Sequence, residues 1–251
     1  MANVYGSAGV AVDAAGNIYF SVNANGYGRV EKRTPSGRQT ILPFKWLTTP
    51  FGVTVDGSGN VYVTDYEYDK KWGLCLVWRL SPAGVQTRIW IPELRDPSDV
   101  HVDTAGNLYV VDRANNRIVR VAPDGTQETI LPGNLDFPFG IYVDSVGTIT
   151  VSNSMVRAGT IRRDAAGNET KLPFTEVDAP TGLDIDSAGN VYLVQSGGFG
   201  TYGARVLKMT PDGVQSEVPF PRNTLNDPKG IAVTDKAIFV ADNHGIARLD
   251  L

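Results

Sequence analysis

The chain has 251 residues, of which 42% are hydrophobic and 20% charged, and its formal net charge is −4 at pH 7. No apolar run reaches the ~18 residues of a membrane-spanning helix, so we expect no membrane insertion. The negative net charge and the lack of basic runs argue against nucleic acid as a partner. The single cysteine, Cys75, excludes an internal disulfide and a cysteine-based zinc cluster.

The first residues, MANVYGSAG, lack the basic stretch and apolar run of a signal peptide. The compartment therefore stays open. We expect a cytoplasmic protein if this chain is the full-length product, and an extracytoplasmic one if it is an excised sensor domain.

One twelve-residue pattern occurs six times along the chain, the last time in a shortened form. In chain order the copies read GVAVDAAGNIYF, GVTVDGSGNVYV, DVHVDTAGNLYV, GIYVDSVGTITV, GLDIDSAGNVYL and GIAVTDKAIFV. Their landmark positions are Asp13, Asp56, Asp103, Asp144, Asp186 and Thr234. A period in the forties that is filled with short alternating segments is typical of propeller blades. The pattern predicts an all-β, six-bladed propeller that forms a single domain over residues 1–251.

Each copy predicts two strands joined by a tight turn. In the first copy, Val10 and Val12 precede the turn and Ile18 and Phe20 follow it, in the alternation of half-buried strands. The intervening D-x-x-G-N motif suits a short hairpin, since Asp bonds nearby backbone and Gly accepts a left-handed conformation. Because its D-x-x-G part recurs in five copies, we interpret the motif as a structural turn rather than a calcium loop.

Further strands complete each predicted blade. Third strands are predicted at 29–33, 76–80, 117–121, 160–163, 205–209 and 246–251. Fourth strands are predicted at 39–42, 86–91, 127–131, 169–172 and 215–218. Four antiparallel strands per blade match the propeller architecture. The last blade lacks a fourth strand of its own, so we expect residues 2–5 to pair there and close the ring, which would remove two exposed edges.

The repeat P-x-G-[VI]-x-V-D-x-x-G-N-[VIL]-Y-V, followed by D-x-x-N-x-R-[IV], resembles the NHL-repeat family of propellers. The third blade carries it most fully, with DTAGNLY at 103–109 and DRANNRI at 112–118. The resemblance implies a six-bladed fold but no single activity. The family includes sensor domains of bacterial Ser/Thr kinases and modules that bind protein or RNA. The streptogramin-lyase propellers, which are similar at the level of the fold, use histidine, glutamate and magnesium.

The loops opposite the D-x-x-G-N turns differ between blades, and two of them are long insertions at 65–73 and 195–203. Aromatic residues are predicted to gather on this rim: Tyr27, Tyr66, Tyr68, Trp72, Phe199 and Tyr202. Exposed apolar patches are costly, and loops on rigid scaffolds commonly carry function. We therefore expect this rim to be the functional face.

Two rings of positions lie near the predicted axis. The ring at the blade entrances holds Ala8, Phe51, Ser98, Phe139, Thr181 and Lys229. The ring in the middle of the innermost strands holds Ala11, Thr54, His101, Tyr142, Asp184 and Ala232. Small residues are expected in the second ring, yet three polar ones fall on successive blades. Two interpretations stay open: a hydrogen-bonded or water-filled channel, and a proton-transfer cluster in which Asp184 orients His101.

Other polar residues are weaker candidates. His244 lies on the rim of the last blade, where a solvated side chain is the simpler interpretation. Asp65, Asp112 and Asp242 end second strands and could together hold a hard cation, although turn capping explains them more simply. We expect no required cofactor, with magnesium or calcium as an open alternative.

Three functions are compatible with these features. The first is a monomeric propeller that binds a small molecule or peptide over the aromatic rim, with Phe51, Phe139 and Lys229 as the floor of the site and His244 at its edge. The second is a lyase or cyclase that uses His101, Tyr142 and Asp184 for proton transfer at the channel mouth. The third is a scaffold that binds a partner protein across several blades.

Overall fold

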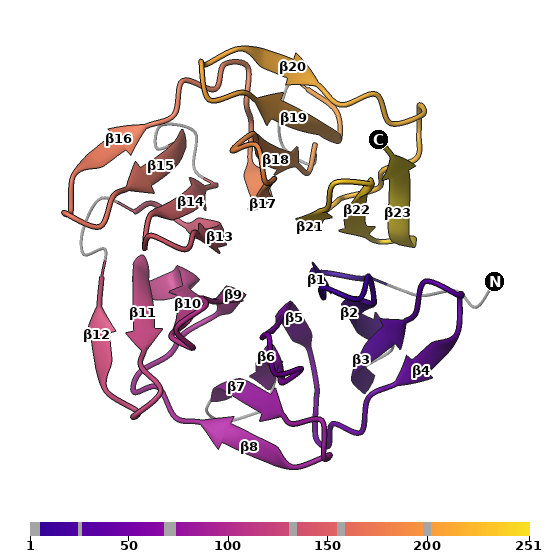
Figure 1. Cartoon of the computed structure of the whole chain (residues 1–251), viewed down its shortest axis with the longest axis vertical. Coiled ribbons are helices and arrows are strands. Elements are labelled where there is room, and N and C mark those ends of the chain that lie inside the picture. Colours follow the sequence, from indigo (N-terminus) through magenta and orange to yellow (C-terminus); the bar gives the residue numbers. More distant parts are fainter. Residues whose placement is uncertain (1–5, 25–26, 68–73, 131–134, 155–158, 198–201) are drawn as a thin grey trace.

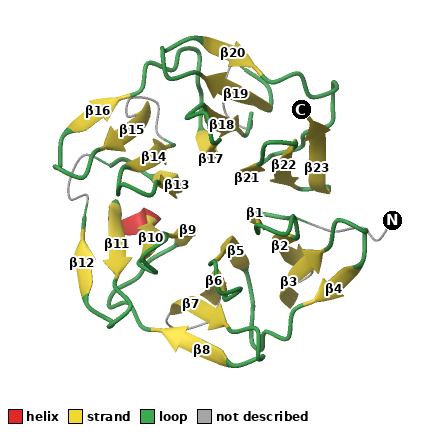
Figure 2. Ribbon diagram, in the orientation of Figure 1, coloured by secondary structure: helices red, strands yellow, loops and turns green. Residues whose placement is uncertain are grey.

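The protein is described by a computed structural model that covers residues 6–24, 27–67, 74–130, 135–154, 159–197 and 202–251. Six antiparallel sheets are arranged in a ring around a central axis (Figure 1). Strands and loops make up almost all of the described chain, apart from one short 3-10 helix in the third blade (Figure 2). The predicted six-bladed propeller is therefore confirmed.

Five of the described sheets have four strands and one has three. The first blade consists of β1 (Val10–Val12), β2 (Ile18–Ala24), β3 (Tyr27–Arg33) and β4 (Gln39–Ile41). The second consists of β5 (Pro50–Val55), β6 (Val61–Glu67), β7 (Leu74–Leu80) and β8 (Gln86–Ile89). The third consists of β9 (Pro97–Val102), β10 (Leu108–Asp112), β11 (Arg117–Val121) and β12 (Gln127–Thr129). The fourth blade consists of β13 (Pro138–Val143), β14 (Ile149–Asn153), β15 (Gly159–Arg163) and β16 (Glu169–Lys171). The fifth consists of β17 (Pro180–Ile185), β18 (Val191–Gln195), β19 (Arg205–Met209) and β20 (Gln215–Glu217). The sixth consists of β21 (Gly230–Val233), β22 (Ala237–Asp242) and β23 (Gly245–Asp250).

The D-x-x-G-N turns join the first and second strands of the blades. In the first turn, the Asp13 carboxylate accepts hydrogen bonds from the backbone N–H of Ala15 and Asn17, the Asn17 amide and the Tyr19 hydroxyl, over 2.7–3.0 Å. Gly16 has a φ of +77°, in the left-handed region. Asp56 and Asp186 repeat all four bonds. These bonds occupy the carboxylates, which confirms a structural turn.

The apolar core lies between neighbouring blades. Val77 of the second blade packs with Leu108 and Val110 of the third. On the other side of the third blade, Val111 packs with Ile141 of the fourth. Each sheet is thus buried on both faces by its neighbours, as in other propellers, and no blade has a core of its own.

Glycines let the innermost strands of neighbouring blades approach each other closely near the central axis. Five copies of the pattern begin with Gly, and a Cβ on Gly182 would lie 2.5 Å from the Lys229 carbonyl oxygen. A Cβ on Gly230 would lie equally close to the carbonyl oxygen of Ala8, which joins the last blade to the first. Any larger side chain would push these strands apart.

The first described residues contact the sixth blade, where this blade meets the first (Figure 1). The Ser7 N–H donates to the Asp242 carbonyl oxygen at 2.9 Å. The predicted pairing of residues 2–5 with the last blade lies outside the described residues. No helix in the described part of the chain is long and apolar enough to cross a membrane.

Candidate functional site

A cavity of about 300 Å³ lies on the axis, enclosed by the six innermost strands. All six residues of the predicted mid-strand ring line it: Ala11, Thr54, His101, Tyr142, Asp184 and Ala232. Four residues of the predicted entrance ring also line it: Ala8, Ser98, Phe139 and Lys229. The period of the repeat therefore identified all six mid-strand residues and four of the six entrance residues of the lining, although they come from six separate parts of the chain.

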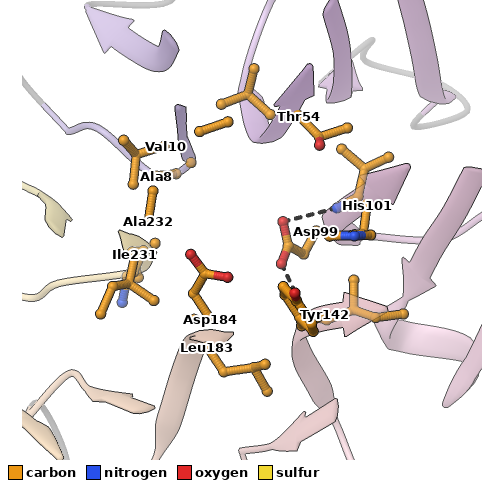
Figure 3. A pocket seen from close by; sticks show the side chains of 18 of the residues that line it. Ala8, Val10, Thr54, Asp99, His101, Tyr142, Leu183, Asp184, Ile231 and Ala232 are labelled. Carbon is orange, nitrogen blue, oxygen red and sulfur yellow. Dashed lines mark hydrogen bonds between the residues drawn. The ribbon is translucent and has the colours of Figure 1, made fainter. Parts of the chain in front are cut away.

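The wall of this cavity is chemically divided. Asp99, His101, Tyr142 and Asp184 come from the third, fourth and fifth blades, while small apolar side chains such as Ala8 and Ala232 come from the first and sixth (Figure 3). Polar groups that converge in a concave site, with apolar side chains beside them, are typical of small-molecule sites.

Asp99 belongs to this polar wall but was not predicted. It replaces the glycine that begins the other five copies, and this single departure from the repeat is the sequence feature that could have identified it. Its carboxylate accepts hydrogen bonds from the backbone N–H of Val100 at 2.9 Å and of Ile141, in the next blade, at 3.0 Å. Gly52 makes room for it, because a Cβ there would lie 2.7 Å from an Asp99 carboxylate oxygen.

Asp184 is held in the same way two blades further on. Its carboxylate accepts from the backbone N–H of Ile185 at 2.8 Å and of Val233, in the next blade, at 2.6 Å. Burial raises the pKa of both Asp99 and Asp184 to about 7, against the lowering effect of these backbone bonds. The charge of Asp184 raises the pKa of Asp99 further. Both carboxyl groups can therefore gain or lose a proton near neutral pH.

His101 and Tyr142 lie side by side, with ring centroids 5.1 Å apart. Burial lowers the pKa of His101 to about 4, although a hydrogen bond with the Val143 backbone acts in the opposite direction. The imidazole is thus neutral at pH 7. Burial, together with the charge of Asp184, raises the pKa of Tyr142. Among the described hydrogen bonds, those of the Asp184 carboxylate go to backbone N–H groups, so the predicted orientation of His101 by Asp184 has no bond to support it.

The polar wall is also within reach of the face that carries the D-x-x-G-N turns. A hollow of about 700 Å³ there shares His101 and Tyr142 with the axial cavity and includes the turn residues Asp103 and Asp144 in its lining. Two of the predicted proton-transfer residues, His101 and Tyr142, therefore line the channel toward the turn face, and the predicted aromatic rim is on the opposite face.

Aromatic rings and an arginine lie together at the entrance on the rim face. Phe51 and Phe139 pack edge to face with centroids 5.5 Å apart. The Arg113 guanidinium lies 5.9 and 5.4 Å from these two rings and 4.9 Å from that of Phe137. It also donates to the Asp96 carboxylate at 2.6 and 2.9 Å. Sequence reasoning missed Arg113, since its partners come from different blades.

The remaining predicted binding residues occupy several places. Lys229 forms an ion pair with Asp227 at 2.6 Å, and the His244 ring lies 3.0 Å from the Asn226 amide. Tyr27 is 80% exposed.

Two further aromatic residues of the predicted rim are described. Tyr66 is partly exposed, and Tyr202 packs under the Arg205 guanidinium at 4.5 Å. Tyr68, Trp72 and Phe199 lie outside the described residues, so the aromatic rim as a whole stays a prediction.

The three aspartates considered for a metal hold loops in place through backbone hydrogen bonds. Asp65, Asp112 and Asp242 are fully or almost fully buried. They accept backbone N–H bonds from Thr49 at 2.7 Å, Arg95 at 2.8 Å and Asn226 at 2.9 Å, respectively.

Within the described ranges, no group of three or more His, Cys, Asp or Glu side chains is arranged to hold a metal ion. These residues do not fit the magnesium that the lyase resemblance implies.

A model of the NHL repeat matches residues 94–121, the third blade, in which the sequence carries the repeat pattern most fully. A comparison with curated proteins finds no match. Similar solved structures include a gluconolactonase from Xanthomonas campestris, at 17% identity and a TM-score of 0.76 over 99% of this chain and 87% of that one.

Lyase propellers are also among the similar structures. A streptogramin B lyase is 17% identical, with a TM-score of 0.68 over 98% of this chain and 93% of that one. A virginiamycin B lyase from Staphylococcus aureus, solved with quinupristin, is 16% identical, with a TM-score of 0.68 over 100% and 97% of the two chains. At these identities the likeness shows the propeller fold alone.

Proposed function

We propose that the protein binds a small molecule in its axial cavity, with the polar groups of the third, fourth and fifth blades on one side of the ligand. The division of the cavity wall carries this proposal. The first and sixth blades have Ala11 and Ala232 at the mid-strand positions, so the fold itself needs only small residues there. His101, Tyr142 and Asp184 are larger and polar, which burial penalises unless a partner satisfies them.

Ligand-observed NMR with a fragment library of neutral, cationic and anionic compounds tests this proposal. Ala11 lines the cavity, so Ala11→Leu should fill part of it and remove the binding signals of the fragments that bind wild-type protein. Ala14 is exposed in the neighbouring turn, and Ala14→Leu is the matched control that should leave binding unchanged. The proposal is wrong if no fragment binds the wild type, or if Ala11→Leu folds and binds the same fragments equally well.

An acid–base enzyme of the lyase or cyclase class is the second candidate. A neutral His101 can accept a proton at pH 7, and carboxyl groups with a pKa of about 7 can donate or accept one. The same NMR samples distinguish the two functions, because turnover would produce new product signals with time. Stable spectra for every bound fragment would favour a binding protein.

A further inference from the structure

We propose that the axial cavity binds a small organic cation, a protonated amine, whose charge lies between the carboxylates of Asp99 and Asp184. This inference rests on the proposed function and names the class of its ligand. Figure 3 shows both carboxylates pointing into the opening, with the apolar residues Ala8 and Val10 across from Asp99 and Ala232 next to Asp184. In this arrangement the carboxylates can bind the ammonium group of the ligand, and the apolar side chains can contact its hydrocarbon part.

No ion pair in the described part of the chain includes Asp99 or Asp184. The two cations nearest the entrance have other partners, since Lys229 pairs with Asp227 and Arg113 with Asp96. A carboxylate away from water needs a compensating charge or several hydrogen bonds. A cationic ligand would supply the missing charge.

The hydrogen bonds of the two carboxylates leave acceptor capacity in the cavity. Each Asp99 oxygen accepts one backbone N–H, from Val100 and Ile141. Asp184 does the same with Ile185 and Val233. An ionised carboxylate has about four lone-pair sites, so each side chain can accept further bonds from an ammonium group with three donors.

The other groups of the lining favour an organic cation over other ligands. The Tyr142 ring stands beside the carboxylates and can contribute a cation–π contact. An anion would meet two carboxylates and only Lys229 as a cation in the described lining. A divalent metal ion would need more ligands than two separate carboxylates, and no cluster of three suitable side chains occurs among the described residues.

Three probes of one shape test the charge of the ligand: benzylamine, benzyl alcohol and benzoate. Titration at pH 8, followed by chemical-shift changes of the protein, should show benzylamine binding at least tenfold more tightly than benzyl alcohol. Benzoate should be the weakest of the three. Equal binding of amine and alcohol, or tighter binding of benzoate, would overturn the inference while leaving a small-molecule site in place. If neither these probes nor any library fragment binds, the proposed function itself fails.

Variants then test the two carboxylates. Asp99→Asn and Asp184→Asn should each weaken benzylamine binding about tenfold and leave benzyl alcohol binding nearly unchanged. Asp124 is exposed in an outer hairpin, so Asp124→Asn removes the same charge without touching the cavity. The control should bind benzylamine like the wild type. Unchanged affinity in both folded cavity variants would contradict the inference.

The pH dependence of the wild type tests the inference even if these variants do not fold. The titratable groups that face the two carboxylates are His101 on β9, Tyr142 on β13, Lys229 beside β21 and Asp186, whose charge raises the pKa of Asp184; the described lining from β1 and β5 carries no charge. Between pH 8 and 5.5 an alkylamine stays protonated, while carboxyl groups with a pKa of about 7 take up protons. Benzylamine affinity should fall at least tenfold over this range, and constant affinity would overturn the inference.

Discussion

A carboxyl group whose pKa rises on folding binds its proton more tightly in the folded protein than in the unfolded chain. Asp99 and Asp184 have a pKa of about 7 in the folded protein, compared with an ordinary value of 3.8. Their contribution to stability is therefore complete below pH 4 and is lost as the pH rises through 7. His101 acts in the opposite direction, but only below its ordinary pKa of 6.5.

The free energy of unfolding should consequently be about 1–2 kcal/mol lower at pH 8 than at pH 6. Thermal melts of the wild type at the two pH values measure this difference. In Asp99→Asn the difference should shrink by roughly half, because one of the two titrating groups is gone. Asp124→Asn should keep the full difference. A wild type with the same stability at both pH values would mean that the two carboxyl groups titrate normally.

The sequence located three of the four polar wall residues because the repeat defines equivalent positions. His101, Tyr142 and Asp184 differ from the small residues that the mid-strand ring otherwise holds. Asp99 was overlooked although it breaks the repeat in the same way, at the glycine position. Arg113 could not be found by this comparison, since its place depends on rings that only the closed propeller brings together.

The innermost strands define the width of the cavity through their glycines. A Cβ at Gly52 on β5 would lie 2.6 Å from the Asp99 Cα on β9, so Gly52→Ala must move the two strands apart. We expect a loss of about 1–3 kcal/mol in stability, as for other overpacked sites, and weaker benzylamine binding. Gly57 lies in the turn of the same blade with no atom within 4 Å, and Gly57→Ala is the matched control. Equal melting temperatures for the two variants would contradict the close strand contact.

Strand positions were predictable because alternation and turn residues are local signals. The prediction was less accurate at the strand ends, where tertiary contacts decide. β7 begins at Leu74 instead of the predicted residue 76, because its hairpin with β6 extends to the Tyr66–Cys75 and Glu67–Leu74 pairs. β12 ends at Thr129, although the Ile130 N–H still donates to the Ile118 carbonyl oxygen of β11 at 3.0 Å; the predicted end at residue 131 lies outside the described residues.

At the scale of the whole molecule, shared cores between blades predict a single cooperative unfolding transition. Ile238 is fully buried in the core between the fifth and sixth blades. Ile238→Ala should cost about 2–5 kcal/mol, and each kcal/mol should lower the melting temperature by roughly 2–4 °C. All four tryptophans lie between residues 46 and 90, far along the chain from this site.

The tryptophan fluorescence transition should therefore shift to lower temperature together with the circular dichroism transition of the strands, although no tryptophan lies near Ile238 in sequence. Val214 is 58% exposed at an outer hairpin, so Val214→Ala should leave both transitions in place. An early dichroism transition in Ile238→Ala, with tryptophan fluorescence unchanged until the wild-type melting temperature, would show that blades unfold separately. Coincident shifts would instead mean that each blade depends on the closed ring, because a blade without its neighbours exposes both faces of its sheet.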